Sequence, residues 1–355
     1  MTNRRTLLKG LAAATLLPAR GWAAAGSPEW IAAARSPGGD HALHGIGASG
    51  EITFSIPLPG RGHAAAAHPY RAEAVAFARR PGTFGIVLDC RTGAIIHRLS
   101  PPEGRQFNGH GAFSLDGSWL YTSEVVAEGS AGRVGLWDVR AGYARAGEWD
   151  SRGVGPHELR LLPNGNIVIA NGGIRTDPQD RTPLNIDSMR PNLAVLDADG
   201  DLVSCRELPA ELHQNSIRHL ALLPGAIAFA MQWQGDPAEP VPLLGLARDE
   251  APLTNHPVAE ADAFRMNGYA GSIATNQDLI AMTSPRGGVA MLFTAEGRHC
   301  ATLDRADLCG VAAARDSAFT MTDGGGAIWA ADPQGLRLRR RHSLSWDNHL
   351  VRIAP

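Results

Sequence analysis

The stretch His110–Glu124, HGAFSLDGSWLYTSE, decides the fold. A short run beginning at His110 reaches the pair Asp116-Gly117, and a second run rich in aromatic and β-branched residues follows it. An Asp-Gly pair between two such runs is a strong signal for a tight β-hairpin. The stretch therefore predicts two neighbouring antiparallel strands joined by a turn.

The same unit recurs along the whole chain. Its seven copies begin at His63, His110, His157, His219, Gly271, Cys309 and His349. The starts are separated by 47, 47, 62, 52, 38 and 40 residues. A four-stranded blade of a β-propeller takes roughly 40–50 residues. The repeat therefore predicts an all-β fold, a seven-bladed β-propeller.

The last unit supplies a single strand before the chain ends, near His349. Three further strands are predicted near the other terminus, at Trp30–Ala34, Ala42–Ile46 and Ile52–Ile56. We expect the N- and C-terminal strands to share one blade, because that closes the ring and removes exposed sheet edges. The predicted propeller is one domain, residues 26–355.

Composition excludes several classes of protein. The chain has 355 residues, of which 44% are hydrophobic and 19% charged, so a large core can be buried and disorder is not expected. The net charge is −2 and no block of basic residues marks a nucleic-acid surface. No apolar run reaches about 20 residues, so no membrane span is expected.

Residues 1–25 resemble an export signal. The run Asn3–Lys9, NRRTLLK, is a twin-arginine motif, and a short apolar run and the small residues Ala23–Ala25 follow it. We expect cleavage near Ala25 and a periplasmic mature protein. An oxidising periplasm permits disulfides. Cys300 and Cys309 are nine residues apart. This spacing is compatible with a disulfide between them and equally with two buried free thiols.

Five of the 13 histidines occupy one place in the repeat. They lie at, or within one residue of, the start of the first strand of a blade, which is the innermost strand of a propeller and lines its channel. We expect the mouth of that channel to gather His63, His110, His157, His219 and His349. Imidazole is a good ligand for iron, copper, zinc and nickel. The alternative is a structural role, as hydrogen-bonding plugs between blades.

This placement is similar in kind to the histidine ring that holds the copper cluster of nitrous oxide reductase, another seven-bladed propeller. The resemblance is limited to the placement, because the chain shows no electron-transfer copper domain. Iron and copper are the candidate ions.

A long loop is predicted at residues 171–191, between the second and third strands of blade three. Loops of this length in compact domains are usually functional or mobile. This loop and its neighbours are expected to bring guanidinium and amide groups to the histidine face for a carboxylate or phosphate ligand. The candidate ligand-binding residues are Arg105, Arg175, Asp187, Arg218, Gln232 and Arg286. An ordered lid whose charges pair with one another is the alternative.

Two acidic residues stand next to the histidines. Glu158 follows His157, and Asp347 lies two residues before His349. Carboxylates commonly accept a hydrogen bond from a metal-bound imidazole, so both are candidates for orienting the ligands. No nucleophile motif and no glycine-rich phosphate loop is present, so catalytic residues are not assigned and an enzymatic activity is left undecided.

Several stretches are similar to the family catalogued as domain of unknown function 1513. They are Phe77–Gly82, Gly155–Glu158, Asn171–Ile174, Leu184-Asn185, Asp187–Pro191, Ser216–Leu220, Gln232–Gly235, Thr283–Gly288 and Trp346–His349. The resemblance implies twin-arginine export and a seven-bladed propeller. It also implies the company of imelysin-type and di-haem periplasmic proteins in bacterial iron acquisition, and it implies no particular reaction.

These observations lead to one principal hypothesis and two others. The first is a periplasmic metal-handling propeller, accessory to iron acquisition, that binds iron or copper, or a metal chelate, at the histidine-lined mouth. The second is an oxidoreductase or lyase acting at the same mouth. The third is a scaffold that docks partner proteins on its flat face.

Overall fold

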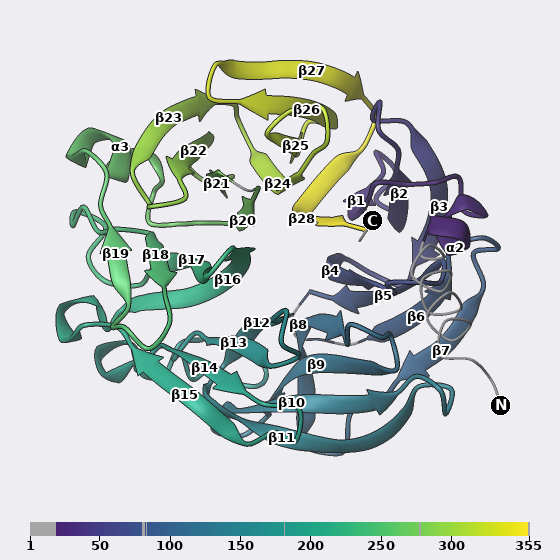
Figure 1. The fold of residues 1–355 in the computed structure, drawn as a ribbon, viewed down its shortest axis with the longest axis horizontal. Helices are drawn as coiled ribbons and strands as arrows, with labels where there is room; N and C mark the ends of the chain where they lie inside the picture. The colour runs from purple at the N-terminus through teal and green to yellow at the C-terminus, as the bar shows by residue number, and fades with distance from the viewer. Residues whose placement is uncertain (1–18, 80–81, 83, 181, 277, 354–355) are drawn as a thin grey trace, which may run out of the picture.

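The computed structural model describes residues 19–353 apart from 80–81, 83, 181 and 277. Its strands form seven four-stranded antiparallel sheets, arranged around a common axis as the blades of a β-propeller (Figure 1). The predicted all-β, seven-bladed fold is confirmed. The twin-arginine motif lies outside the described residues, so export and a periplasmic location stay predictions.

The innermost strands contact one another in a closed circle around the central channel. In chain order they are β4 (Gly62–Ala67), β8 (Arg105–Phe113), β12 (Pro156–Leu161), β16 (Asn215–Leu223), β20 (Ser272–Thr275), β24 (Leu308–Ala313) and β28 (Ser345–Arg352). Every predicted repeat start lies in one of these strands or, for Gly271, immediately before one.

The other strands follow outward in each blade. The second strands are β5 (Glu73–Ala78), β9 (Trp119–Val126), β13 (Ile167–Asn171), β17 (Ala226–Trp233), β21 (Leu279–Ser284), β25 (Phe319–Asp323) and β1 (Trp30–Arg35). The third strands are β6 (Gly85–Asp89), β10 (Ala131–Asp138), β14 (Asn192–Leu196), β18 (Leu244–Ala247), β22 (Val289–Thr294), β26 (Ala327–Asp332) and β2 (His41–Ile46). The outermost are β7 (Ile95–Leu99), β11 (Ala144–Val154), β15 (Leu202–Glu207), β19 (Thr254–His256), β23 (His299–Asp304), β27 (Gly335–Arg341) and β3 (Ile52–Leu58).

Helical segments in the described residues are short and lie between strands or before the first one. They are α2 (Ala19–Ala23), η1 (Ile186–Ser188), η2 (Ala210–Leu212) and α3 (Glu260–Arg265). None of them has the length and apolar character needed to cross a bilayer.

The last blade is built from both ends of the chain, as predicted. Strand β28 pairs antiparallel with β1, and Ala32 lies opposite Leu350. The blade then continues outward through β2 and β3. This pairing closes the circle of sheets, so the innermost strands of the first and last blades become neighbours.

Apolar side chains on facing blade surfaces form the core. One cluster joins Phe77 of the first complete blade to Phe107 and Trp137 of the next. Strands of this fold are buried on both faces, which explains why their apolar residues run nearly continuously instead of alternating. All four cysteines are free thiols, so the bridge between Cys300 and Cys309 is not formed.

Trp22 fixes the segment before the first strand to the propeller. Its indole is buried with Ala25 against Ala72, and its Nε1 donates a hydrogen bond to the carbonyl oxygen of His68 over 3.0 Å. Cleavage near Ala25, the expectation from sequence, would remove this anchor. Cleavage ahead of α2 would retain it.

We predict that Trp22→Ala lowers the free energy of unfolding by about 3 kcal/mol, because a buried indole and its hydrogen bond are lost. The measurement is urea denaturation of protein that retains the chain from Ala19 onward. Trp233→Phe, at a partly buried tryptophan in another blade, is the control and is expected to cost less. An unchanged stability in Trp22→Ala would contradict the anchoring role.

Candidate metal centre

Backbone irregularities aim the five predicted histidines at the channel. In each of five innermost strands the pairing register shifts at or around the histidine, as for His63 between Gly62 and Ala65 and for His110 between Phe107 and Gly111. The same holds for His157, His219 and His349. A β-bulge re-aims the side chain that it carries and often lies beside a functional site. The bulges therefore turn side chains from five blades toward one axis.

The five imidazoles pack in a closed cycle, here called the histidine cluster. Ring centroids of neighbours lie 4.9 Å apart for His63 and His110, 4.6 Å for His110 and His157, and 4.8 Å for His157 and His219. The cycle closes with 4.9 Å between His219 and His349 and 4.6 Å between His349 and His63. Sequence reasoning thus identified residues that the fold brings into direct contact.

Ring nitrogens within the histidine cluster have metal-ligand spacing. Two sets of three, His63 with His110 and His349, and His110 with His157 and His219, each place their ligand atoms within 4.8 Å of one another. Both sets contain His110. Three imidazoles with a further open position are a common way to hold a reactive metal ion.

Burial favours the neutral form of His110, His157 and His349. His110, His157, His219 and His349 are all buried. Loss of solvation, together with the neighbouring imidazoles, lowers the pKa of His110 and of His157 well below the ordinary value. For the same reasons the pKa of His349 falls to about 3. Neutral imidazole is the form that binds metals.

Two histidines of the cluster each have a ring nitrogen with neither a hydrogen-bond nor an ion-pair partner among the described residues. These nitrogens are Nδ1 of His157 and Nε2 of His349, and both are buried. A buried polar atom without a partner costs about 1–3 kcal/mol. Structural plugs between blades would satisfy these atoms, whereas ligands for an ion would leave them available.

Glu158 supports the histidine cluster from a neighbouring blade. Its Oε2 lies 3.4 Å from Nδ1 of His219 and accepts the backbone N–H of Leu220, while its Oε1 pairs with Arg160 at 2.6 Å. Burial raises the pKa of Glu158, but Arg160 and the hydrogen bond with His219 hold it down to about 2. Glu158 therefore contacts the imidazole of His219 and not that of the adjacent His157, which the sequence had suggested as its partner.

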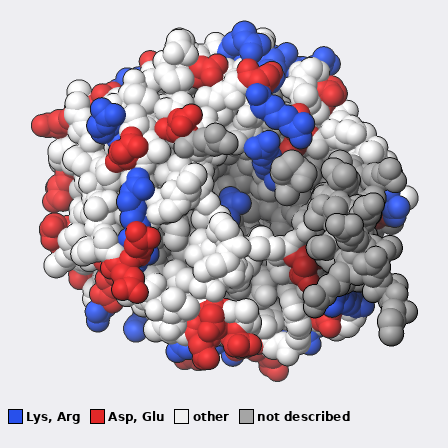
Figure 2. Space-filling view, viewed as in Figure 1, with Lys and Arg blue, Asp and Glu red and all other residues white. Residues whose placement is uncertain are grey.

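A cavity of about 420 Å³ reaches the histidine cluster from one side. Its walls are the parts of the innermost strands that follow the histidines, from Ala64 through Thr275 to Arg352, and it also touches His110 and His349. Figure 2 shows a hollow at the centre of the propeller, with a basic side chain inside it. The imidazoles are thus buried partway along the channel and do not line an open mouth.

The long loop lies at the opposite end of the innermost strands. Pro156, at the start of β12, pairs with Asn171, from which the loop departs. Arg175 and Asp187 in this loop are exposed. The cavity extends toward the other face, so the structure does not bring these two residues to it.

The three other predicted ligand-binding residues, Arg218, Arg286 and Gln232, lie in different environments. Arg218, next to His219, is buried, and burial lowers its pKa to about 10. Arg286 is exposed and its guanidinium lies 4.2 Å from the ring centroid of Tyr269. Gln232 is half-buried and donates to the carbonyl oxygen of Ala270.

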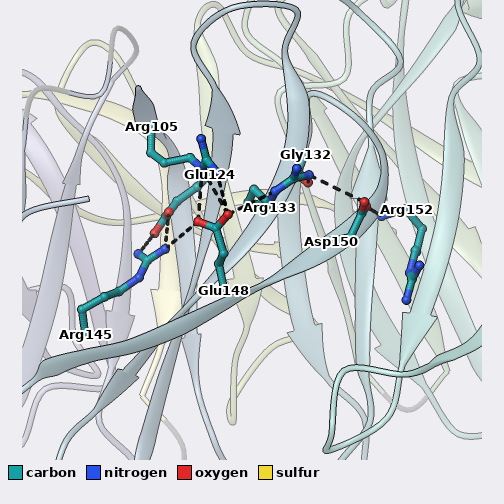
Figure 3. A network of polar contacts seen from close by, with 8 residues as sticks. All are labelled: Arg105, Glu124, Gly132, Arg133, Arg145, Glu148, Asp150 and Arg152. Atoms are coloured by element: carbon teal, nitrogen blue, oxygen red, sulfur yellow. Dashed lines mark hydrogen bonds and ion pairs between the residues drawn. The ribbon is translucent and has the colours of Figure 1, made fainter. Parts of the chain in front are cut away.

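Arg105 belongs to an ion network inside its own blade (Figure 3). Its Nη2 lies 2.7 Å from Oε1 of Glu148, which also contacts Arg133 and Arg145. Arg145 in turn pairs at 2.6 Å with Glu124, a fully buried carboxylate. The guanidinium of Arg105 is therefore engaged away from the histidine cluster.

Asp347 does not contact His349. Its Oδ2 accepts from Nε of Arg61 over 2.6 Å, an ion pair between the last innermost strand and the residue that precedes β4. The two other innermost strands, β20 and β24, carry small or sulfur-containing residues at the positions equivalent to the histidines. In β24 the register shift contains Cys309 and Gly310. The Cys309 thiol donates a hydrogen bond to Asp307, and burial together with this carboxylate raises the pKa of the thiol.

Sequence reasoning missed three residues beside the cluster. Arg160 has the same strand side as Glu158, two positions away, and that spacing was the available signal. Tyr269 and Asn348 meet across the channel, where the Asn348 amide donates to the Tyr269 hydroxyl over 3.2 Å. Nothing in the sequence relates these two, because they lie in different blades and 79 residues apart.

Fold and site together define a seven-bladed β-propeller with a buried histidine cluster in its channel. The chain belongs to the family described as protein of unknown function DUF1513, which matches residues 56–353. It is also similar to a solved chain titled Kuenenia stuttgartiensis hydrazine synthase, with a TM-score of 0.59 and 13% sequence identity. That likeness covers 85% of this chain and 89% of the other, and it shows the fold alone. A comparison with curated proteins finds no match.

We predict that Arg105→Met lowers the free energy of unfolding by about 1 kcal/mol, because one partner of Glu148 is lost from a partly exposed network. Metal affinity is expected to stay unchanged, since the guanidinium does not reach the histidine cluster. Urea denaturation and a metal titration measure the two effects. Reduced metal affinity with unchanged stability would show that Arg105 serves the site instead.

Proposed function

We propose that this protein binds a transition-metal ion in its central channel, at the histidine cluster. The observation that carries the proposal is the contact of five imidazoles from five blades, four of them buried, in which Nδ1 of His157 and Nε2 of His349 have no other partner among the described residues. Burying imidazole rings without partners for their nitrogens is costly. An ion offsets the cost of burying their nitrogens.

The donor set narrows the class of ion. Imidazole nitrogen suits iron, copper, nickel and zinc, and poorly suits magnesium or calcium. The one nearby thiol, Cys309, is protonated and donates to Asp307, so the set is all nitrogen. Iron and copper are our candidates for the ion in the cell. The periplasmic, iron-uptake setting that the family resemblance implies is part of the same proposal.

Substitution of His110 is the sharpest test of metal binding, because both sets of three histidines contain this residue. We predict that His110→Ala lowers the affinity for Co²⁺ and Cu²⁺ at least about 100-fold, since a direct ligand counts for more than a supporting residue. His63→Ala leaves the set of His110, His157 and His219 complete and is expected to cost less. The measurement is titration of chelator-treated, untagged protein, with elemental analysis and the visible absorption of Co²⁺.

His41→Ala is the matched control, because His41 lies in β2, away from the channel. It is expected to bind metal as the wild type does. Elemental analysis of wild-type protein exported to the periplasm tests the setting directly. No bound metal after growth with abundant iron and copper, together with no Co²⁺ titration, would overturn the proposal.

Glu158 provides a test of orientation. Glu158→Gln keeps the size of the side chain but removes the charge beside Nδ1 of His219. We predict a metal affinity about 10–100-fold weaker, which is the usual cost of losing a carboxylate partner of a ligand. Glu158→Asp is expected to restore part of the loss, and the Co²⁺ absorption spectrum reports the change in geometry. Equal affinity in the Gln variant and the wild type would refute this role.

The cavity favours one second candidate, an oxidoreductase that uses the bound metal. A volume of about 420 Å³ lies within the range of small-molecule sites, and the cavity touches His110 and His349 directly. A redox-active ion there would be accessible to a small substrate. Reduction or oxidation of the bound copper by small donors, abolished in His110→Ala, distinguishes this candidate from simple metal storage.

A further inference from the structure

Arg218 carries a buried positive charge that the protein does not balance. Its side chain is 7% exposed, and none of the described residues forms an ion pair or hydrogen bond with its guanidinium. A buried ion without a partner costs several kcal/mol. Arginine stays protonated under these conditions, so the charge must be matched by something else.

Three buried carboxylates near the channel are paired with other arginines, each with a different one at 2.6 Å. The pairs are Glu158 with Arg160, Asp347 with Arg61, and Asp323 with Arg305. None of these carboxylates is left for Arg218. Arg218 therefore has no partner among these ion pairs.

Arg218 lies beside the histidine cluster on the side away from the cavity. It precedes His219 within the bulge of β16 and is absent from the cavity walls. Its charge acts on His157, one of the imidazoles with a free ring nitrogen, and interacts with the phenol of Tyr269. The Tyr269 hydroxyl also accepts a hydrogen bond from the amide of Asn348, so polar groups from three blades interact on this side of the histidine cluster.

We infer that Arg218, with Tyr269 and Asn348, binds a small carboxylate that is the exogenous ligand of a metal ion held by His110, His157 and His219. A buried cation without a partner favours an anionic ligand. A carboxylate matches the planar guanidinium through two parallel N–H···O bonds, and its oxygens are also good metal ligands. Three imidazoles leave a coordination position open for it.

This inference deepens the proposed function and rests on it, but the guanidinium is an anchor for a carboxylate even without metal. We expect sodium formate to raise the melting temperature of metal-free wild-type protein, relative to sodium chloride of equal ionic strength. With Co²⁺ bound, formate is expected to change the visible absorption spectrum, because it enters the coordination shell.

Arg218→Met removes the charge and keeps much of the side-chain volume. The variant is expected to retain Co²⁺, to be at least as stable as the wild type without formate, and to bind formate about tenfold or more weakly. Tyr269→Phe, which removes a single hydroxyl, is expected to weaken formate several-fold and serves if Arg218→Met does not fold. Arg352→Met is the control, because Arg352 lines the cavity on the other side.

The outcomes separate the two proposals. Co²⁺ binding with an identical formate response in wild type, Arg218→Met and Tyr269→Phe would overturn the carboxylate site alone. Formate stabilisation that requires Arg218, in protein that binds no metal, would overturn the metal proposal and support the anchor. Loss of the response in Arg352→Met but not in Arg218→Met would place the anion in the cavity and overturn this inference.

Discussion

The pairing of β28 with β1 is the constraint on which the rest of the structure depends. It joins two segments from opposite ends of the chain and turns a row of sheets into a closed circle. Closure makes the last innermost strand a neighbour of the first. His63 and His349, 286 residues apart, then lie with ring centroids 4.6 Å apart, and Arg61 reaches Asp347. An open array would leave the histidine cluster incomplete.

β-Bulges and small residues in the innermost strands allow the five imidazoles to pack together in the channel. A regular strand alternates its side chains between two blade surfaces, so a histidine in it would point into the packed core. The register shifts release the five imidazoles toward the axis. Gly109, with φ of +92°, adopts a backbone conformation that disfavours other residues, and a Cβ atom there would lie 2.6 Å from the His63 ring. Close packing of imidazoles therefore depends on a glycine as well as on histidines.

The two sides of the histidine cluster differ in character. Toward the carboxyl ends of the innermost strands lies a cavity with many small apolar side chains. Toward the other end the channel holds paired charges, the contact of Tyr269 with Asn348, and Arg218, which has no partner among the described residues. An ion at the cluster would thus be reached by small molecules from one side and meet fixed polar groups on the other.

The repeat of short strands and turns was enough to predict seven blades, the shared last blade and the five histidines, because each copy carries its own local signals. Side-chain partners could not be read in the same way. Arg105 and Arg218 both stand near a histidine in the sequence, yet one is held by Glu148 within its blade and the other is buried without a described partner. The carboxylate that contacts His219 is Glu158, which comes from the preceding blade. Periodicity fixes which strand a residue occupies, whereas contacts across the channel depend on bulges, closure and the packing of blades that are distant in the chain.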